Sequence, residues 1–76
     1  MKSNLLKAER IKIGITQKNI SEYLNIDVST YSKKENGLIE FKASEIRLLK
    51  KVLDLTPQKI SEIFFENEVA LKTTQM

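Results

Sequence analysis

Apolar residues recur at helical spacing along most of the chain. Leu6 and Ile13 share one face of the first segment, and Ile46, Leu49 and Leu53 share one face of a later segment. No segment alternates apolar and polar residues for long enough to require a strand, so we expect an all-α fold. The pattern predicts five helices, over residues 3–13, 16–24, 27–36, 43–53 and 57–65.

Three of these helices begin with the same arrangement of residues. Thr16, Asp27 and Thr56 each stand where a side-chain oxygen can accept a hydrogen bond from an unpaired N–H of the first turn. An apolar residue precedes each of them, and another occupies the fourth helical position, which is the pattern of a hydrophobic staple. Pro57 occupies a first helical position, where its missing N–H costs nothing. The expected staples are Ile15 with Ile20, Ile26 with Tyr31, and Leu55 with Ile60.

The helix ends are marked as well. Gly14 ends the first helix, and Asn36-Gly37 is a turn signal after the third. Asn25 and Asp54 stand where a left-handed residue is wanted, a conformation that both tolerate better than most residues. The turn between the second and third helices is therefore very short, which is the geometry of a helix-turn-helix unit.

Composition narrows the class of protein. The chain has 76 residues, no Cys and no His, which excludes a disulfide scaffold and removes the usual zinc ligands and two common catalytic side chains. No apolar run approaches the roughly 18 residues of a membrane span, and the N-terminus does not resemble a signal peptide. We therefore expect a small cytoplasmic protein that is not an enzyme and needs neither a cofactor nor a metal.

The charge is uneven along the chain. Residues 1–53 hold 11 Lys and Arg against 6 Asp and Glu, a balance of +5, whereas residues 54–76 hold 2 against 4, a balance of −2. A basic body of this kind favours a polyanionic partner, although mixed charges that only solvate helix faces are the simpler alternative.

The segment from Thr16 to Gly37 carries a resemblance. Thr16-Gln17, the small Ser21, Leu24 and then "DVSTYSKKENG" are similar to the helix-turn-helix of Cro and phage-repressor proteins, the XRE type. The resemblance extends from about Leu6 to Phe65. It implies a compact five-helix, lambda-repressor-like domain that binds double-stranded DNA, usually as a homodimer on a palindromic operator. In such a domain the helix at 27–36 enters the major groove, and the helix at 16–24 lies across the DNA backbone.

The resemblance also assigns roles to single residues. It pairs Arg10 with Glu35 in a structural ion pair, and it has Gln17 contact a phosphate and brace the recognition helix. The residues expected to face base edges are Val28, Ser29 and Lys33. Thr30, Ser32 and Asn36 are expected at the DNA backbone, and the charge of Lys18 and Lys42 makes them further candidates for phosphate contacts. Short hydroxyl side chains and a lysine on one helix face suit this use, because they donate to phosphates and base edges.

Four features depart from the family pattern. Asn25 replaces a common Gly, Ser21 replaces a common Ala, and the loop at 38–42 lacks the usual lysine-rich run and contains Glu40, which would repel phosphate. Lys34 stands where the family usually has an aliphatic or aromatic residue. Its spacing from Tyr31 predicts a stem at the edge of the core, with the ammonium extending to solvent or to a phosphate.

The remaining expectations concern the core and the tail. We expect Tyr31 in the core with its hydroxyl near the surface, and Ile20, Leu24, Ile46, Leu49, Leu53 and Phe64 beside it. We expect one domain over residues 1–66, with a tail over residues 67–76 that forms dimer contacts or is partly disordered. The alternative function is that of an antitoxin or other regulatory protein, which would use the loop at 38–42 and the apolar and acidic tail to bind a protein partner.

Overall fold

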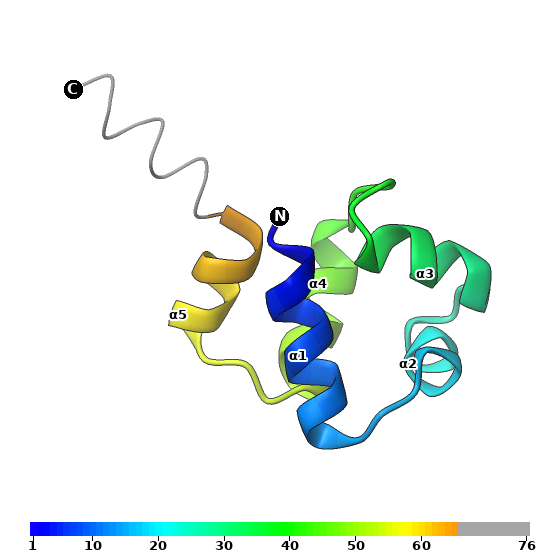
Figure 1. Cartoon of the computed structure of the whole chain (residues 1–76), viewed down its shortest axis with the longest axis horizontal. Coiled ribbons are helices and arrows are strands. Elements are labelled where there is room, and N and C mark those ends of the chain that lie inside the picture. Colours follow the sequence, from blue (N-terminus) through cyan, green and yellow to red (C-terminus); the bar gives the residue numbers. More distant parts are fainter. Residues whose placement is uncertain (66–76) are drawn as a thin grey trace.

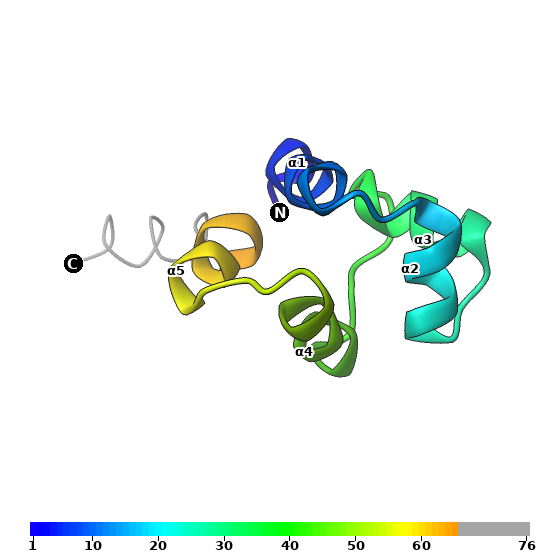
Figure 2. The same ribbon diagram turned by 90° about the horizontal axis from the view of Figure 1, so that it is seen from below.

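The structure is a computed structural model that describes residues 1–65. Helices account for most of these residues. Within that range there is no strand, so the prediction of an all-α fold is confirmed. Figures 1 and 2 show α2 and α3 together at one end of the domain and α5 at the other. The helices are α1 (Ser3–Ile13), α2 (Gln17–Leu24), α3 (Val28–Glu35), α4 (Ala43–Val52) and α5 (Pro57–Ile60), which continues as a π-helical turn over Ser61–Phe65.

Two of the three predicted side-chain caps are present. Thr16 accepts a hydrogen bond from the N–H of Asn19 at 3.0 Å, and Thr56 accepts one from the N–H of Lys59 at 3.1 Å. The prediction for Asp27 is wrong, because its side chain makes no cap hydrogen bond. Its carboxylate is exposed to solvent, and only its backbone carbonyl enters the helical hydrogen-bond pattern of α3.

The two non-glycine residues expected in a left-handed conformation adopt it. Asn25 has φ of 60° and Asp54 has φ of 52°. Each lets the chain reverse immediately after a helix. The left-handed conformation turns the backbone so that the N–H groups at the helix end donate to carbonyls of the last turn. The short connection between α2 and α3 depends on Asn25 in this way.

The core is a single cluster that all five helices border. Its buried members are Leu6, Ile20, Leu24, Tyr31, Leu49, Leu53, Leu55 and Ile63, with Ile46 and Phe64 only half-buried. Ile13 was expected on the inner face of α1 but is 43% exposed. It is the last residue of α1, and a Cβ added at the neighbouring Gly14 would meet nothing within 4 Å, so this end of α1 extends past the packed core.

Two predictions remain, one about membrane spans and one about the tail. None of the helices within residues 1–65 combines the length and the apolar character needed to cross a membrane. The predicted dimer contacts or disorder of the tail over residues 67–76 lie outside the described residues.

Candidate nucleic-acid interface

α2 and α3 pack directly against each other across the turn at Asn25 and Ile26. The N–H of Ile26 donates to the carbonyl of Ser21 at 3.0 Å, and the N–H of Asn25 donates to the carbonyl of Glu22 at 3.1 Å. The Ser21 hydroxyl is buried but donates to the carbonyl of Lys18 at 2.7 Å, so it is satisfied within its own helix. The buried hydroxyl of Ser21 is therefore not left without a hydrogen-bond partner between the two helices.

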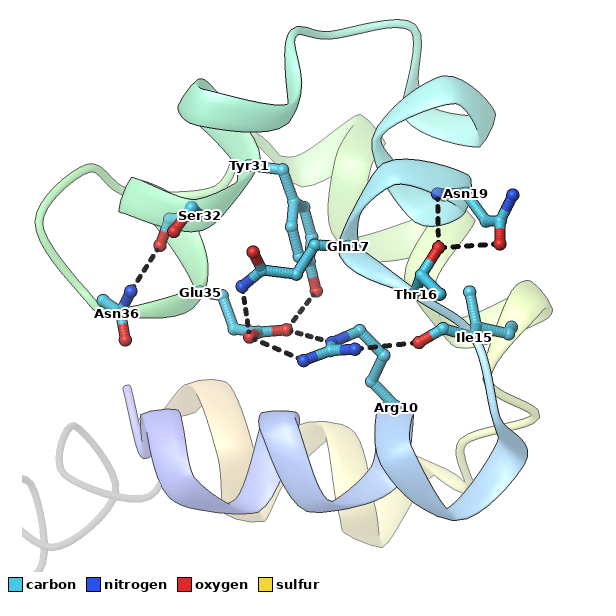
Figure 3. Close-up of polar contacts among 9 residues, drawn as sticks. All are labelled: Arg10, Ile15, Thr16, Gln17, Asn19, Tyr31, Ser32, Glu35 and Asn36. Carbon is cyan, nitrogen blue, oxygen red and sulfur yellow. Dashed lines mark hydrogen bonds and ion pairs between the residues drawn. The ribbon is translucent and has the colours of Figure 1, made fainter.

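Glu35, the last residue of α3, is the centre of a buried hydrogen-bond network (Figure 3). Its carboxylate accepts from Arg10 Nε at 2.7 Å and Nη2 at 3.2 Å, from Gln17 Nε2 at 2.9 Å and from the Tyr31 hydroxyl at 2.8 Å. Arg10 also donates Nη1 to the carbonyl of Ile15 at 2.8 Å. One side chain of α3 is thus bound by α1, by α2 and by its own preceding turn. The sequence predicted that the hydroxyl of Tyr31 lies near the surface. In the structure it faces inward and donates to Glu35.

The charge states in this network follow from its geometry. Burial alone would raise the pKa of Glu35, but the hydrogen bonds from Arg10, Gln17 and Tyr31 outweigh burial and lower it below the ordinary value. Burial, together with the hydrogen bond to Glu35, raises the pKa of the Tyr31 hydroxyl. At neutral pH the network therefore contains a carboxylate, a guanidinium and a neutral phenol, and each donor has an acceptor.

The opposite side of α3 is polar and open. Ser29 and Lys33 are exposed, Val28 is 46% exposed, and Thr30 and Ser32 are half-buried beside them. Within residues 1–65 Lys33 forms no ion pair, so no acid of the described chain neutralises it. We call Val28, Ser29 and Lys33 the outward face of α3.

Comparison with known proteins agrees with this geometry. The family model HTH_3, a helix-turn-helix, matches residues 6–60. The chain belongs to this family. Its fold is accordingly that of a DNA-binding regulator of the XRE type. No curated protein and no solved structure gives a significant match to the chain.

The other residues expected at the DNA backbone differ in their exposure to solvent. Lys18, Asn36 and Lys42 are exposed, and Gln17 is half-buried with its amide directed to Glu35. The Asn36 amide donates to the carbonyl of Ser32 at 2.9 Å, which fixes its side chain on the last turn of α3 (Figure 3). Gln17 thus braces α3 through Glu35, and its contact with a phosphate stays a prediction.

Lys34 differs from its prediction. Its side chain is only 6% exposed, and its ammonium lies 2.6 Å from Glu45 Oε1 at the start of α4. The ammonium does not extend to solvent or to a phosphate position, because a buried acid from another helix binds it. We therefore remove Lys34 from the expected backbone contacts.

Glu45 is a structural residue of the interface to which the sequence analysis assigned no role. Its Oε1 accepts from the Lys34 ammonium and, at 2.8 Å, from the backbone N–H of Lys42. Burial would raise the pKa of Glu45, but these two hydrogen bonds outweigh it and lower the pKa. The sequence offers one weak signal: Glu45 stands four residues before the core residue Leu49, on the same face of its helix, so its carboxylate lies near the core, but this spacing does not identify the partner.

Residues 1–65 contain no group of three or more His, Cys, Asp or Glu side chains that could bind a metal ion. The groups that the interface offers a ligand are hydroxyls, an amide, lysine ammonium groups and one valine, which suit phosphates and base edges.

Proposed function

We propose that this protein is a transcriptional repressor that binds an operator in double-stranded DNA as a homodimer. The observation that carries the proposal is the exposed, uncompensated polar face of α3, held on a helix whose other sides are fixed by Glu35 and by the core. A helix presented in this way fits the major groove of B-DNA, where each base pair shows a distinct set of donors and acceptors.

Each residue of the outward face has a role in this proposal. Lys33 donates to O6 or N7 of a guanine, Val28 packs against a thymine methyl group, and Ser29 donates to a base edge. The backbone contacts come from Gln17, Lys18, Thr30, Ser32, Asn36 and Lys42. These contacts set the register of α3 on the duplex but do not read sequence.

Repression would follow from occlusion. Two copies of the domain place one α3 each in major grooves about one turn of DNA apart, roughly 34–36 Å, on a palindromic site. A dimer bound in this way covers the site and excludes polymerase from it.

Selection of bound sequences from a random DNA pool tests the proposal directly. We expect an enriched palindrome whose half-sites are about 10 base pairs apart, centre to centre. Such a result would support DNA as the partner and the homodimer together. A pool that shows no enrichment over repeated rounds would contradict the proposed function, and an enriched asymmetric site would contradict the dimer alone.

Replacing Lys33 by alanine should weaken binding to the selected operator and relax preference at one base pair. The expected loss is about 1–3 kcal/mol, because one donor to a base edge disappears. Competition binding against operators altered at single positions measures the effect. Lys51→Ala is the matched control, since Lys51 is an exposed lysine in the last turn of α4 and should leave base preference unchanged. An equal loss on every sequence would identify Lys33 as a phosphate contact.

A second candidate function is binding of a regulatory protein partner, as an antitoxin does. The observation that favours it is a groove of about 310 Å³ whose lining includes the apolar side chains of Ile39, Phe41, Phe64 and Phe65 beside Glu40. Leu38, beside the groove in sequence, is 76% exposed. Capture of a stoichiometric protein partner, together with no retardation of genomic DNA, would favour this candidate over the repressor.

A further inference from the structure

The buried pair of Lys34 and Glu45 links the last turn of α3 to the first turn of α4. Its two side chains are 6% and 7% exposed, and the charged atoms are 2.6 Å apart. The Lys34 ammonium also lies 6.0 Å from the centre of the Phe41 ring, in the loop between the two helices. Glu45 accepts from the N–H of Lys42 as well, so the same carboxylate binds α3 and the N-terminus of α4.

Three consecutive residues of α3 point in three directions. Successive residues of an α-helix are about 100° apart around its axis. Glu35 is bound to α1 and α2, and Lys34 is bound to α4, which leaves Lys33 on the third side, exposed. The two buried acids therefore constrain the rotation of α3 about its own axis from two sides, and that rotation decides where Lys33 points.

A buried ion pair is better suited to fixing the rotation of α3 than to stabilising the fold. The free-energy cost of removing two charges from water offsets most of the attraction between them. Apolar side chains of similar volume are therefore often at least as stabilising at such a position. Apolar contact is also non-directional, so it tolerates a small rotation of a helix. A charge pair is directional, because a rotation that separates Lys34 from Glu45 leaves two buried charges without a partner.

We propose that Lys34 and Glu45 are positioning residues that set the rotation of α3 and thereby the sequence specificity of the domain, with little effect on its stability. The inference rests on the proposed function, in which the outward face of α3 reads base edges. The pair determines which bases Lys33 and Ser29 reach, although neither Lys34 nor Glu45 touches DNA.

The double variant Lys34→Met with Glu45→Gln tests the proposal. Methionine keeps most of the lysine volume, the glutamine Oε1 still accepts from the N–H of Lys42, and the net charge of the chain does not change. We expect an unchanged or raised midpoint of urea unfolding. We also expect the ratio of operator affinity to shuffled-DNA affinity to fall about tenfold, comparable to the discrimination carried by one base pair.

The neutralised pair Glu9→Gln with Lys12→Met is the matched control. It removes an ion pair of 3.2 Å whose lysine is 69% exposed, and with it the 3.8 Å contact between Glu9 and Lys59. Neither contact involves α3, so the affinity ratio should stay as it is. Residual dipolar couplings of the free Lys34→Met, Glu45→Gln variant give a measurement that needs no DNA. The Cα–Hα vectors of α3 should no longer fit the wild-type orientation, while those of α1 and α2 still fit. These vectors point away from the helix axis, so they respond to a rotation about it, whereas the N–H bonds lie nearly along the axis.

The possible results separate the two proposals. Wild-type protein that does not discriminate its selected operator from shuffled DNA overturns the proposed function, and the inference falls with it. Wild-type discrimination with an unchanged ratio in the double variant, or with unchanged couplings for α3, overturns the inference alone. A large drop in the unfolding midpoint of the double variant, or failure to fold, also overturns it, because the pair would then be a source of stability.

Discussion

Replacing Arg10 by methionine is expected to destabilise the domain by about 3–5 kcal/mol, because Glu35 then remains buried without its cationic partner. Glu35 has no exposed surface, and two of its hydrogen bonds come from Arg10. A small domain has only about 5–15 kcal/mol of stability in total, so the variant should show a much lower midpoint of urea unfolding. Lys12→Met is the matched control on the same helix. The Lys12 side chain is 69% exposed, so its ion pair with Glu9 should contribute less than about 1 kcal/mol.

The double variant Arg10→Met with Glu35→Gln separates an uncompensated charge from lost packing. If the buried charge causes the destabilisation, removing that charge should restore part of the stability, because the neutral amide still accepts from the Tyr31 hydroxyl. A double variant that is no more stable than Arg10→Met alone would contradict this explanation. In that case the methylene groups of Arg10 or its hydrogen bond to the carbonyl of Ile15 would account for the loss.

The destabilisation by Arg10→Met should also depend on pH. In the wild-type protein the pKa of Glu35 is lowered, so its contribution to stability is fully present above the unfolded value of about 4.3 and is lost as pH falls through the folded value. Without Arg10, burial dominates and the pKa of Glu35 rises above the unfolded value, so acid favours the folded variant relative to neutral pH. The difference in unfolding free energy between the two proteins should therefore shrink between pH 7 and about pH 4. A constant difference across that range would show that Glu35 does not titrate as proposed.

Much of the fold was predictable because short-range signals determine it. Thr16, Thr56, Asn25 and Asp54 act within one turn of their own helix, so the sequence around each of them contains the information needed. The side-chain cap predicted at Asp27 failed at the same scale, because the spacing allows that hydrogen bond but does not require it.

The site was predictable only where a resemblance supplied the partner. Arg10 and Glu35 are 25 residues apart, and no local rule connects them. For Lys34, helical spacing correctly placed the stem at the core but gave no information about α4, so the ammonium was directed outward. The partner became identifiable only when α3 and α4 were placed together, because a buried lysine requires an acid whose position depends on the tertiary fold.

Operator affinity should fall about a hundredfold between roughly 50 and 200 mM salt. Two exposed lysines of each protomer, Lys18 and Lys42, are proposed to contact phosphates, so a dimer neutralises about four, and each contributes about −0.9 to the slope of log affinity against log salt. Filter binding or fluorescence anisotropy across a salt series measures this slope. An affinity that does not respond to salt would count against DNA as the partner.

Variants of single lysines then show which cations meet the phosphates. Lys18→Gln or Lys42→Gln should each reduce the slope by about 1.8, because every substitution occurs twice in the dimer. The Lys34→Met, Glu45→Gln variant should leave the slope unchanged, because the Lys34 ammonium is paired with Glu45 inside the domain. A reduction of similar size in that variant would mean that Lys34 leaves Glu45 for a phosphate on binding. The salt series therefore distinguishes a lysine that contacts the DNA from a lysine that holds the helix that contacts it.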